Sequence, residues 1–375
     1  MHFGKPFSRS KTGYRQVDTD HFVKPSVFEK ILNLIPITPL LGSVIVALVS
    51  GPLGNFFFLY FISNDFYRSL YSSLWIINAG ESGFINEVTF IPQLLIANLL
   101  WYSFIFYLVF SIGRLRSLLI NKELHLVSLA QGGKNTVNAI FKNVSNPLPQ
   151  LAIAGVFLLI YGSSAPQLME MGVLIPANAP IYLLRSLFRS IIFGSFLWIY
   201  GSSLWSLYRF GQKPLRLRSY HEDPMLGLRE LGSLSFSYSL IYFTGLGIFV
   251  AHIFFANLIG YIADINLIFL LLLPPLGIAL FISPLISFHK KMVEAKNLEL
   301  ERLRKEYTKL MDQVTESGDP DLEFKRLIVY DSLERKVAAI PTWPYESPLM
   351  GKLVIIMLSV TASIIARYIM IFLKI

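Results

Sequence analysis

Four ionisable side chains interrupt the long apolar stretches of this chain, and they are its clearest candidates for functional chemistry. They are Arg185, Arg189, His252 and Arg367. A charge inside a bilayer is costly, so each is a candidate for a functional role. Arg185 and Arg189 are four residues apart and share one helix face, where they would form an electropositive entrance that favours anions or phosphate headgroups. In the structural alternative, Arg185 reaches the outer surface and Arg189 pairs with Glu170 or Asp264.

A second group of polar residues lies near the inner surface in the predicted topology. His221, Glu222 and Asp223 are consecutive, and His289 stands at the inner mouth of a later apolar run. A histidine and two carboxylates could bind a divalent ion, although an isolated triple is a weak signal. Capping of the next helix explains the carboxylates equally well. The sequence therefore leaves the metal question open and predicts no cofactor.

Two adjacent prolines, Pro274 and Pro275, lie near the middle of the apolar run 265–288. Proline removes a backbone donor and clashes with the preceding turn, so this pair predicts a helix that is kinked or broken at mid-membrane. Broken membrane helices expose backbone carbonyls and often line cavities. This pattern is typical of transport proteins.

Other chemistries have little support in the sequence. Cysteine is absent, which excludes disulfides, thiolate metal sites and thiol nucleophiles. The net charge of +9 is explained by membrane topology rather than by nucleic-acid binding. No catalytic motif stands out, so we do not expect an enzyme.

The candidate residues must be positioned by membrane helices. Hydrophobic residues make up 54% of the 375 residues, mean hydropathy is +0.54, and the excess is concentrated in runs. About 20 apolar residues suffice to cross a bilayer as a helix. The runs are 37–62, 88–112, 149–161, 181–208, 233–259, 265–288 and 353–373. The third is short, and either extends to residue 165 or is re-entrant. The predicted fold is an all-α, polytopic transmembrane helical bundle of about seven spans.

Basic residues predict the orientation of this bundle, because they accumulate in cytoplasmic loops. Lysine and arginine are frequent in residues 1–36 and in the gaps that follow spans 2, 4 and 6, whereas the other gaps contain only Arg68. This places the N-terminal arm in the cytoplasm and the C-terminus outside. The polar, basic N-terminus does not fit a cleavable signal peptide, so span 1 is expected to act as an anchor. In the gap after span 2, Val137, Ile140, Phe141 and Val144 form one apolar helix face, which either lies on the membrane surface or packs on neighbouring spans.

Residues 289–347 are expected to form a cytoplasmic antiparallel helical hairpin between span 6 and the last span, 348–375. Ser317-Gly318-Asp319-Pro320 contains a helix stop followed by a helix start. The outgoing arm has an apolar seven-residue repeat that Lys296 interrupts at one position. A coiled coil between subunits is the alternative, and the two arrangements can coexist.

Three stretches together resemble an uncharacterised family of prokaryotic multi-span inner-membrane proteins. The first is H-x-D-x-x-x-G-L-x-x-L-G from His221 to Gly232. The second comprises Pro284-Leu285 with His289-x-x-Met292-x-x-Ala295-Lys296, and the third is Pro-Thr-Trp-Pro-Tyr at 341–345. The resemblance covers about the C-terminal half. It implies a prokaryotic inner membrane and a multi-span topology, with no assigned activity.

Three functions compete on this basis. The leading one is a transport or channel-like protein, homo-oligomeric and of anion-conducting type. The second is a membrane sensor or scaffold that binds a soluble partner through its cytoplasmic hairpin. The third is a lipid-modifying membrane enzyme that would use His221, Asp223 and His289.

Overall fold

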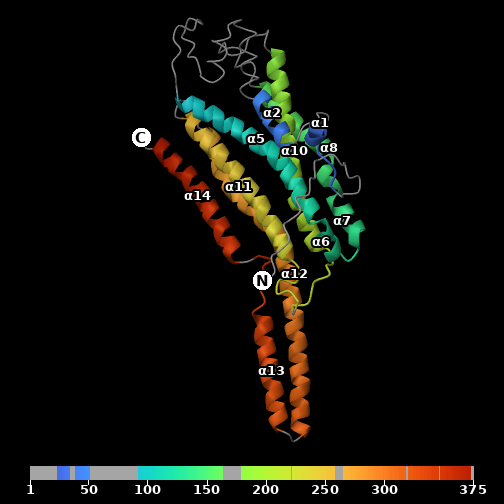
Figure 1. Ribbon diagram of the computed structural model, residues 1–375. Helices are drawn as coiled ribbons and strands as arrows, with labels where there is room; N and C mark the ends of the chain where they lie inside the picture. The colour runs from blue at the N-terminus through green and yellow to red at the C-terminus, as the bar shows by residue number, and fades with distance from the viewer. Residues whose placement is uncertain are drawn as a thin grey trace, which may run out of the picture. The chain divides into compact units, whose positions relative to one another are not determined.

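The computed structural model describes residues 23–33, 39–50, 92–163, 179–220, 222–257, 265–317, 320–345 and 347–372. Within these ranges the chain is helical, and no strand is present beyond one isolated bridge between Ala130 and Leu215. The helices are α1 (Val27–Asn33), α2 (Pro39–Ser50), α5 (Pro92–Asn121), α6 (Glu123–Leu129), α7 (Gly133–Phe141), η1 (Lys142–Ser145), α8 (Pro147–Ser163), α10 (Ala179–Gln212), α11 (Arg229–Asn257), α12 (Ile265–Ser317), α13 (Pro320–Ala338) and α14 (Ser347–Phe372). Figure 1 shows their arrangement within each part of the chain.

Five helical stretches are long and apolar enough to cross a membrane. They are 95–121, 133–163, 182–212, 229–255 and 271–309. A shorter apolar stretch, 350–366, lies in α14. These findings confirm an all-helical chain compatible with a membrane, and the number of spans stays a prediction. Of the first predicted span, the described residues include only α2.

The chain divides into two compact units. The first unit contains residues 1–91, 102–116 and 145–197, and the second contains the rest. In the first unit, the ring of Phe193 in α10 packs against Phe104 of α5 and Phe157 of α8, with centroid distances of 6.0 and 5.2 Å. A β-carbon added at Gly194 would lie 2.7 Å from the backbone nitrogen of Ala154. Small residues at such contacts let membrane helices approach closely, which favours their association by packing.

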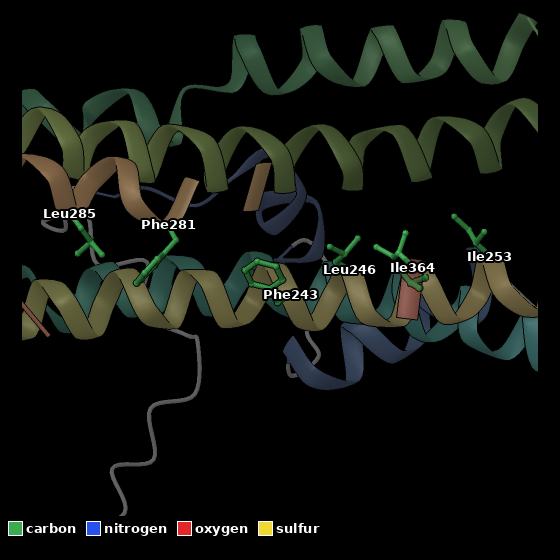
Figure 2. Packing of buried hydrophobic residues seen from close by; sticks show 7 residues of the cluster. Phe243, Leu246, Ile253, Phe281, Leu285 and Ile364 are labelled. Carbon is green, nitrogen blue, oxygen red and sulfur yellow. The ribbon is translucent and has the colours of Figure 1, made fainter. Parts of the chain in front are cut away.

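In the second unit, α11, α12 and α14 pack around a shared apolar core. Figure 2 shows its labelled members, which are Phe243, Leu246 and Ile253 of α11, Phe281 and Leu285 of α12, and Ile364 of α14. In a bilayer, lipid tails would be as apolar as these side chains, so dispersion contacts rather than removal of water would stabilise this core.

Helix α13 packs alongside the distal part of α12 (Figure 1). Leu303 of α12 is buried against Val337, and Arg304 forms an ion pair with Glu334 at 3.2 Å. Further from the bundle, the ring of Tyr307 lies 6.5 Å from that of Tyr330. Residue numbers rise along α12 as they fall along α13, so the two helices are antiparallel. Their predicted place in the cytoplasm stays a prediction.

The apolar face predicted for residues 137–144 is buried against protein. Val137, Phe141 and Val144 are fully buried, and the ring of Phe141 lies 6.4 Å from that of Phe210 in α10. The hydroxyl of Ser206 also donates to the carbonyl oxygen of Ile140, at 3.1 Å. Of the two expected arrangements, packing on a neighbouring span is therefore the one observed.

Candidate functional site

The two predicted arginines of α10 lie among tyrosines from three helices of the first unit. The guanidinium of Arg189 lies within electrostatic range of Tyr161 of α8, Tyr102 of α5 and Tyr182 of its own helix, and that of Arg185 lies within range of Arg189, Tyr102 and Tyr182. The hydroxyl of Tyr182 donates to the backbone oxygen of Tyr161 at 3.0 Å, which ties the start of α10 to the end of α8. We call these five residues the Arg–Tyr cluster.

This cluster is rich in hydrogen-bond donors. A guanidinium offers five N–H groups and no acceptor, and a phenol offers one O–H, which in Tyr182 is used by the backbone oxygen of Tyr161. Charge-assisted donors of this kind recognise anions such as halides, carboxylates or phosphates. Ser186 and Ser190 follow the two arginines directly on α10 and are buried, at 3% and 0% exposure. The arrangement offers donors to an anion. Sequence reasoning missed the tyrosines because Tyr102 and Tyr161 come from helices other than that of the arginines.

The other expected partners and charges of the outer half lie partly outside the described residues. Glu170 and Asp264, the carboxylates expected near Arg189, are both outside them. Arg367 belongs to α14 by its backbone, and the description does not extend to its side chain. The choice between an anion entrance and a structural ion pair stays open for Arg189.

His252 has a structural contact. Its Nδ1–H donates to the backbone oxygen of Ala97 in α5 at 2.8 Å, and its ring lies 5.1 Å from the ring of Trp101. Both contacts belong to the second unit. A histidine that ties one helix to the backbone of another stabilises the bundle, and this contact accounts for the presence of His252 in an apolar span.

The proline pair does not break its helix, which is a correction to one of the two expected outcomes. Helix α12 runs without interruption from Ile265 to Ser317 through Pro274 and Pro275. The hydroxyl of Tyr242 in α11 donates to the backbone oxygen of Leu273 at 2.7 Å. This bond joins α11 to α12 beside the prolines; the carbonyls that lose their helical donor are those of residues 270 and 271. The adjoining Gly277 packs against the rings of Tyr242 and Phe243.

The inner polar residues are used to fold a loop. Asp223 accepts hydrogen bonds from the backbone nitrogens of Met225 at 2.9 Å and Gly227 at 3.0 Å, while Glu222 is exposed. Gly227 has φ of +83°, a conformation that favours glycine. His125 of α6 binds the backbone oxygen of Gly227 at 2.8 Å, which fixes the loop on α6. His221 lies outside the described residues.

His289 is separate from Asp223 in its contacts. Its Nδ1–H donates to the backbone oxygen of Thr342 at 2.7 Å, and its ring stacks on Trp343 with centroids 4.2 Å apart. Among the described residues, no group of three or more histidine, cysteine, aspartate or glutamate side chains could hold a metal ion.

Segments from all three resembling stretches meet at one place, which we call the junction. A β-carbon added at Gly232 would overlap the backbone oxygen of Pro344, so the start of α11 and the 341–345 segment are in direct contact. The ammonium of Lys296 donates to the backbone oxygens of Ala338 and Ile340, the latter at 3.2 Å. A cation there complements the C-terminal end of α13, which explains a lysine at an apolar position of the repeat. Partial burial at the junction also raises the pKa of the Tyr345 phenol above its ordinary value.

A polar attachment of the N-terminal arm was missed by the sequence analysis. Ser26 and Glu29 form a reciprocal capping box at the start of α1, with bonds of 2.8 and 3.1 Å. Glu29 also pairs with Arg116 of α5 at 3.5 Å, and the backbone nitrogen of Val27 donates to Gln150 of α8 at 3.1 Å. The Ser-x-x-Glu spacing could have revealed the helix start, but nothing in the sequence points to Arg116 or Gln150.

No protein-family model, curated protein or solved structure matches the chain. The resemblance carried by the three stretches therefore stays an expectation, and function must be argued from the geometry of the two units.

Proposed function

We propose that the chain is an integral membrane protein of transport or channel type whose Arg–Tyr cluster attracts an anion. The supporting observation is the gathering of two guanidinium groups and three phenols from α5, α8 and α10. These helices belong to spans long and apolar enough to cross a bilayer. A fixed positive charge in a low-dielectric span lowers the barrier for a nearby anion by several RT.

The proposal includes a prokaryotic inner membrane, a cytoplasmic N-terminus and assembly of several copies. The basic loops support this orientation. The loop after α10, which carries Arg216 and Arg218, forms backbone bonds with the end of α6 and with Leu226. Lys122 of α6 also pairs with Glu230 at the start of α11. These contacts place the basic segments of the gaps after spans 2 and 4 together within the second unit, as expected if both face the cytoplasm.

The experiment is anion flux through the full-length protein reconstituted in liposomes. Arg189→Ala should reduce flux about tenfold or more, because loss of one nearby charge raises the barrier by at least ~1.4 kcal/mol. Arg189→Lys should retain part of the flux, since the charge remains while the forked donor geometry is lost. Arg209→Ala, an exposed residue later on the same helix, is the matched control and should leave flux unchanged.

The thermal midpoint of each variant in detergent separates the two roles of Arg189. Unchanged stability with reduced flux supports an anion site. Loss of folded protein without a change in ion selectivity would show instead that Arg189 is half of a structural pair, because removing it strands a buried carboxylate.

A membrane sensor or scaffold is the second candidate, supported by apolar side chains on the α12–α13 pair. Leu298, Ile328 and Val329 are 61%, 54% and 55% exposed on helices rich in charge. Such residues could bind a soluble partner or a second copy of the chain. The enzyme alternative gains no support, since Asp223 and His289 each bind backbone groups.

A further inference from the structure

Helix α1 and the residues just before it are deeply buried in the first unit, which is unusual for part of a polar terminal arm. Val23, Ser26 and Phe28 are at most 2% exposed, and Glu29 is 8% exposed. A seven-residue helix is not stable alone in water, so tertiary contacts must hold it. Contacts with neighbouring helices therefore hold α1 in its place.

Besides the buried apolar side chains of Val23 and Phe28, polar contacts from α5, from η1 and from the start of α8 hold this segment. Arg116 binds the carboxylate of Glu29 and the backbone oxygen of Val23, the latter at 3.3 Å. Gln150 accepts from the backbone of Val27, and the hydroxyl of Ser145 donates to the backbone oxygen of Lys24 at 2.8 Å. Hydrogen bonds and ion pairs of this kind cost less free energy to break than a fully apolar interface, because water can replace each partner when α1 is released.

Several buried polar atoms lie on α5, α8 and α10 within the first unit. They are the side-chain nitrogen of Gln150 and the hydroxyls of Ser111, Ser190 and Ser195, all with residue exposure of 1% or less. In the described part of the chain, no protein group makes a hydrogen bond with these four atoms. A buried polar atom without a partner costs about 1–3 kcal/mol, and water is the usual way in which proteins avoid that cost.

The positions of these atoms relate them to α1. Gly194, next to Ser195, lies against the backbone of Gln150 and Ala154, so Ser195 is close to the part of α8 that holds α1. Gln150 uses its oxygen to bind α1 and keeps its nitrogen for another partner. Ser111 precedes Arg116 on α5 by five residues.

We propose that the α5–α8–α10 group of the first unit contains a water-accessible polar route, and that α1 closes its inner end. This inference rests on the proposed function, because it supplies the route that an anion from the Arg–Tyr cluster would follow. The ion pair between Glu29 and Arg116 holds the closed position. Release of α1 exposes Gln150 and the hydroxyls behind it to the cytoplasmic side.

The absence of cysteine makes the test direct. Ser195→Cys in the full-length protein is treated with the anionic reagent sulfonatoethyl methanethiosulfonate in inside-out membrane vesicles, and the reaction rate is measured. The same measurement is made with Glu29→Gln added. Glutamine keeps the acceptor for the capping box and removes the charge that binds Arg116. We expect Ser195→Cys to react, and Glu29→Gln to raise the rate about tenfold.

Two controls keep the result specific. Lys30→Gln changes an exposed charge on α1 and should not alter the rate. Ile192→Cys places a thiol at a fully buried apolar position of α10 and should stay unreacted in every background.

Each other outcome overturns the inference. No reaction at Ser195→Cys in either background excludes the route, and equal rates in the two backgrounds exclude closure by α1. Reaction at Ile192→Cys in the Glu29→Gln background means that the ion pair only stabilises the unit. Anion flux is measured separately, so a protein that conducts no anion can still show the route, and a conducting protein can still lack it.

Discussion

The Arg–Tyr cluster of the first unit and the junction of the second unit use similar residue types in opposite ways. At the junction and its neighbouring loop, Asp223, His289 and Lys296 each bind backbone atoms of a connecting segment. In the first unit, arginine and tyrosine side chains from three helices lie within electrostatic range of one another. Side chains that bind backbone atoms stabilise the fold, whereas the grouped arginines and tyrosines are the ones that we propose attract an anion.

This comparison shows where membrane charge indicates function. By sequence alone, His252 and Arg189 were equal candidates for a functional role, because both interrupt an apolar span. His252 is explained by one backbone contact, and Arg189 is surrounded by further donors.

The largest effect is expected at the junction. Gly232→Ala places a methyl group on the backbone oxygen of Pro344, and backbone cannot move aside as a side chain does, so we expect a loss of about 3 kcal/mol or more in unfolding free energy. Gly247→Ala, on the same helix with open space around it, should be neutral or slightly stabilising because alanine favours helix. Thermal midpoints of both variants in detergent measure the difference, and equal midpoints would show that the two segments do not touch.

Much of the fold could be predicted from the sequence, because bilayer thickness fixes how long an apolar helix must be. The apolar runs, the amphipathic 137–144 face and the helix stop at 317–320 all follow from local patterns. The effect of Pro274 and Pro275 on their helix was predicted less well. A local rule indicated a kink or a break, and a hydroxyl from a different helix, that of Tyr242, lies at this point of an unbroken α12.

The candidate site was harder to predict than the fold, for a physical reason. Hydrogen bonds between residues far apart in the chain decide whether a polar residue is structural or functional. Asp223 and His289 were grouped by their predicted depth, yet Asp223 binds the backbone of its own loop and His289 binds that of Thr342. Glu29 was hidden in a polar arm, and its pairing with Arg116 is a tertiary contact that no spacing shows.

A smaller effect is expected for the loop after α10. Asp223→Ala removes the acceptor of two backbone N–H groups, and bonds to a carboxylate are stronger than neutral ones, so we expect a loss of about 2 kcal/mol in stability. Glu222→Ala, at the adjacent exposed position, should change stability by less than about 0.5 kcal/mol. Neither variant should alter zinc or manganese binding measured by calorimetry. A divalent-ion affinity that Asp223→Ala abolishes would restore the metal interpretation and contradict a purely structural role.

The smallest effect compares two buried serines of α10, one in each unit. Ser206 donates to the backbone oxygen of Ile140 at 3.1 Å, and Ser206→Ala should cost about 1 kcal/mol, because it leaves that acceptor with one bond fewer. Ser195 is equally buried, but its hydroxyl has no hydrogen bond within the described residues, so Ser195→Ala should change stability by less than about 0.5 kcal/mol. Equilibrium unfolding of the two variants in the same detergent provides the comparison. A loss at Ser195 as large as that at Ser206 would mean that its hydroxyl has a strong protein partner, which would remove one of the polar atoms that the proposed route requires.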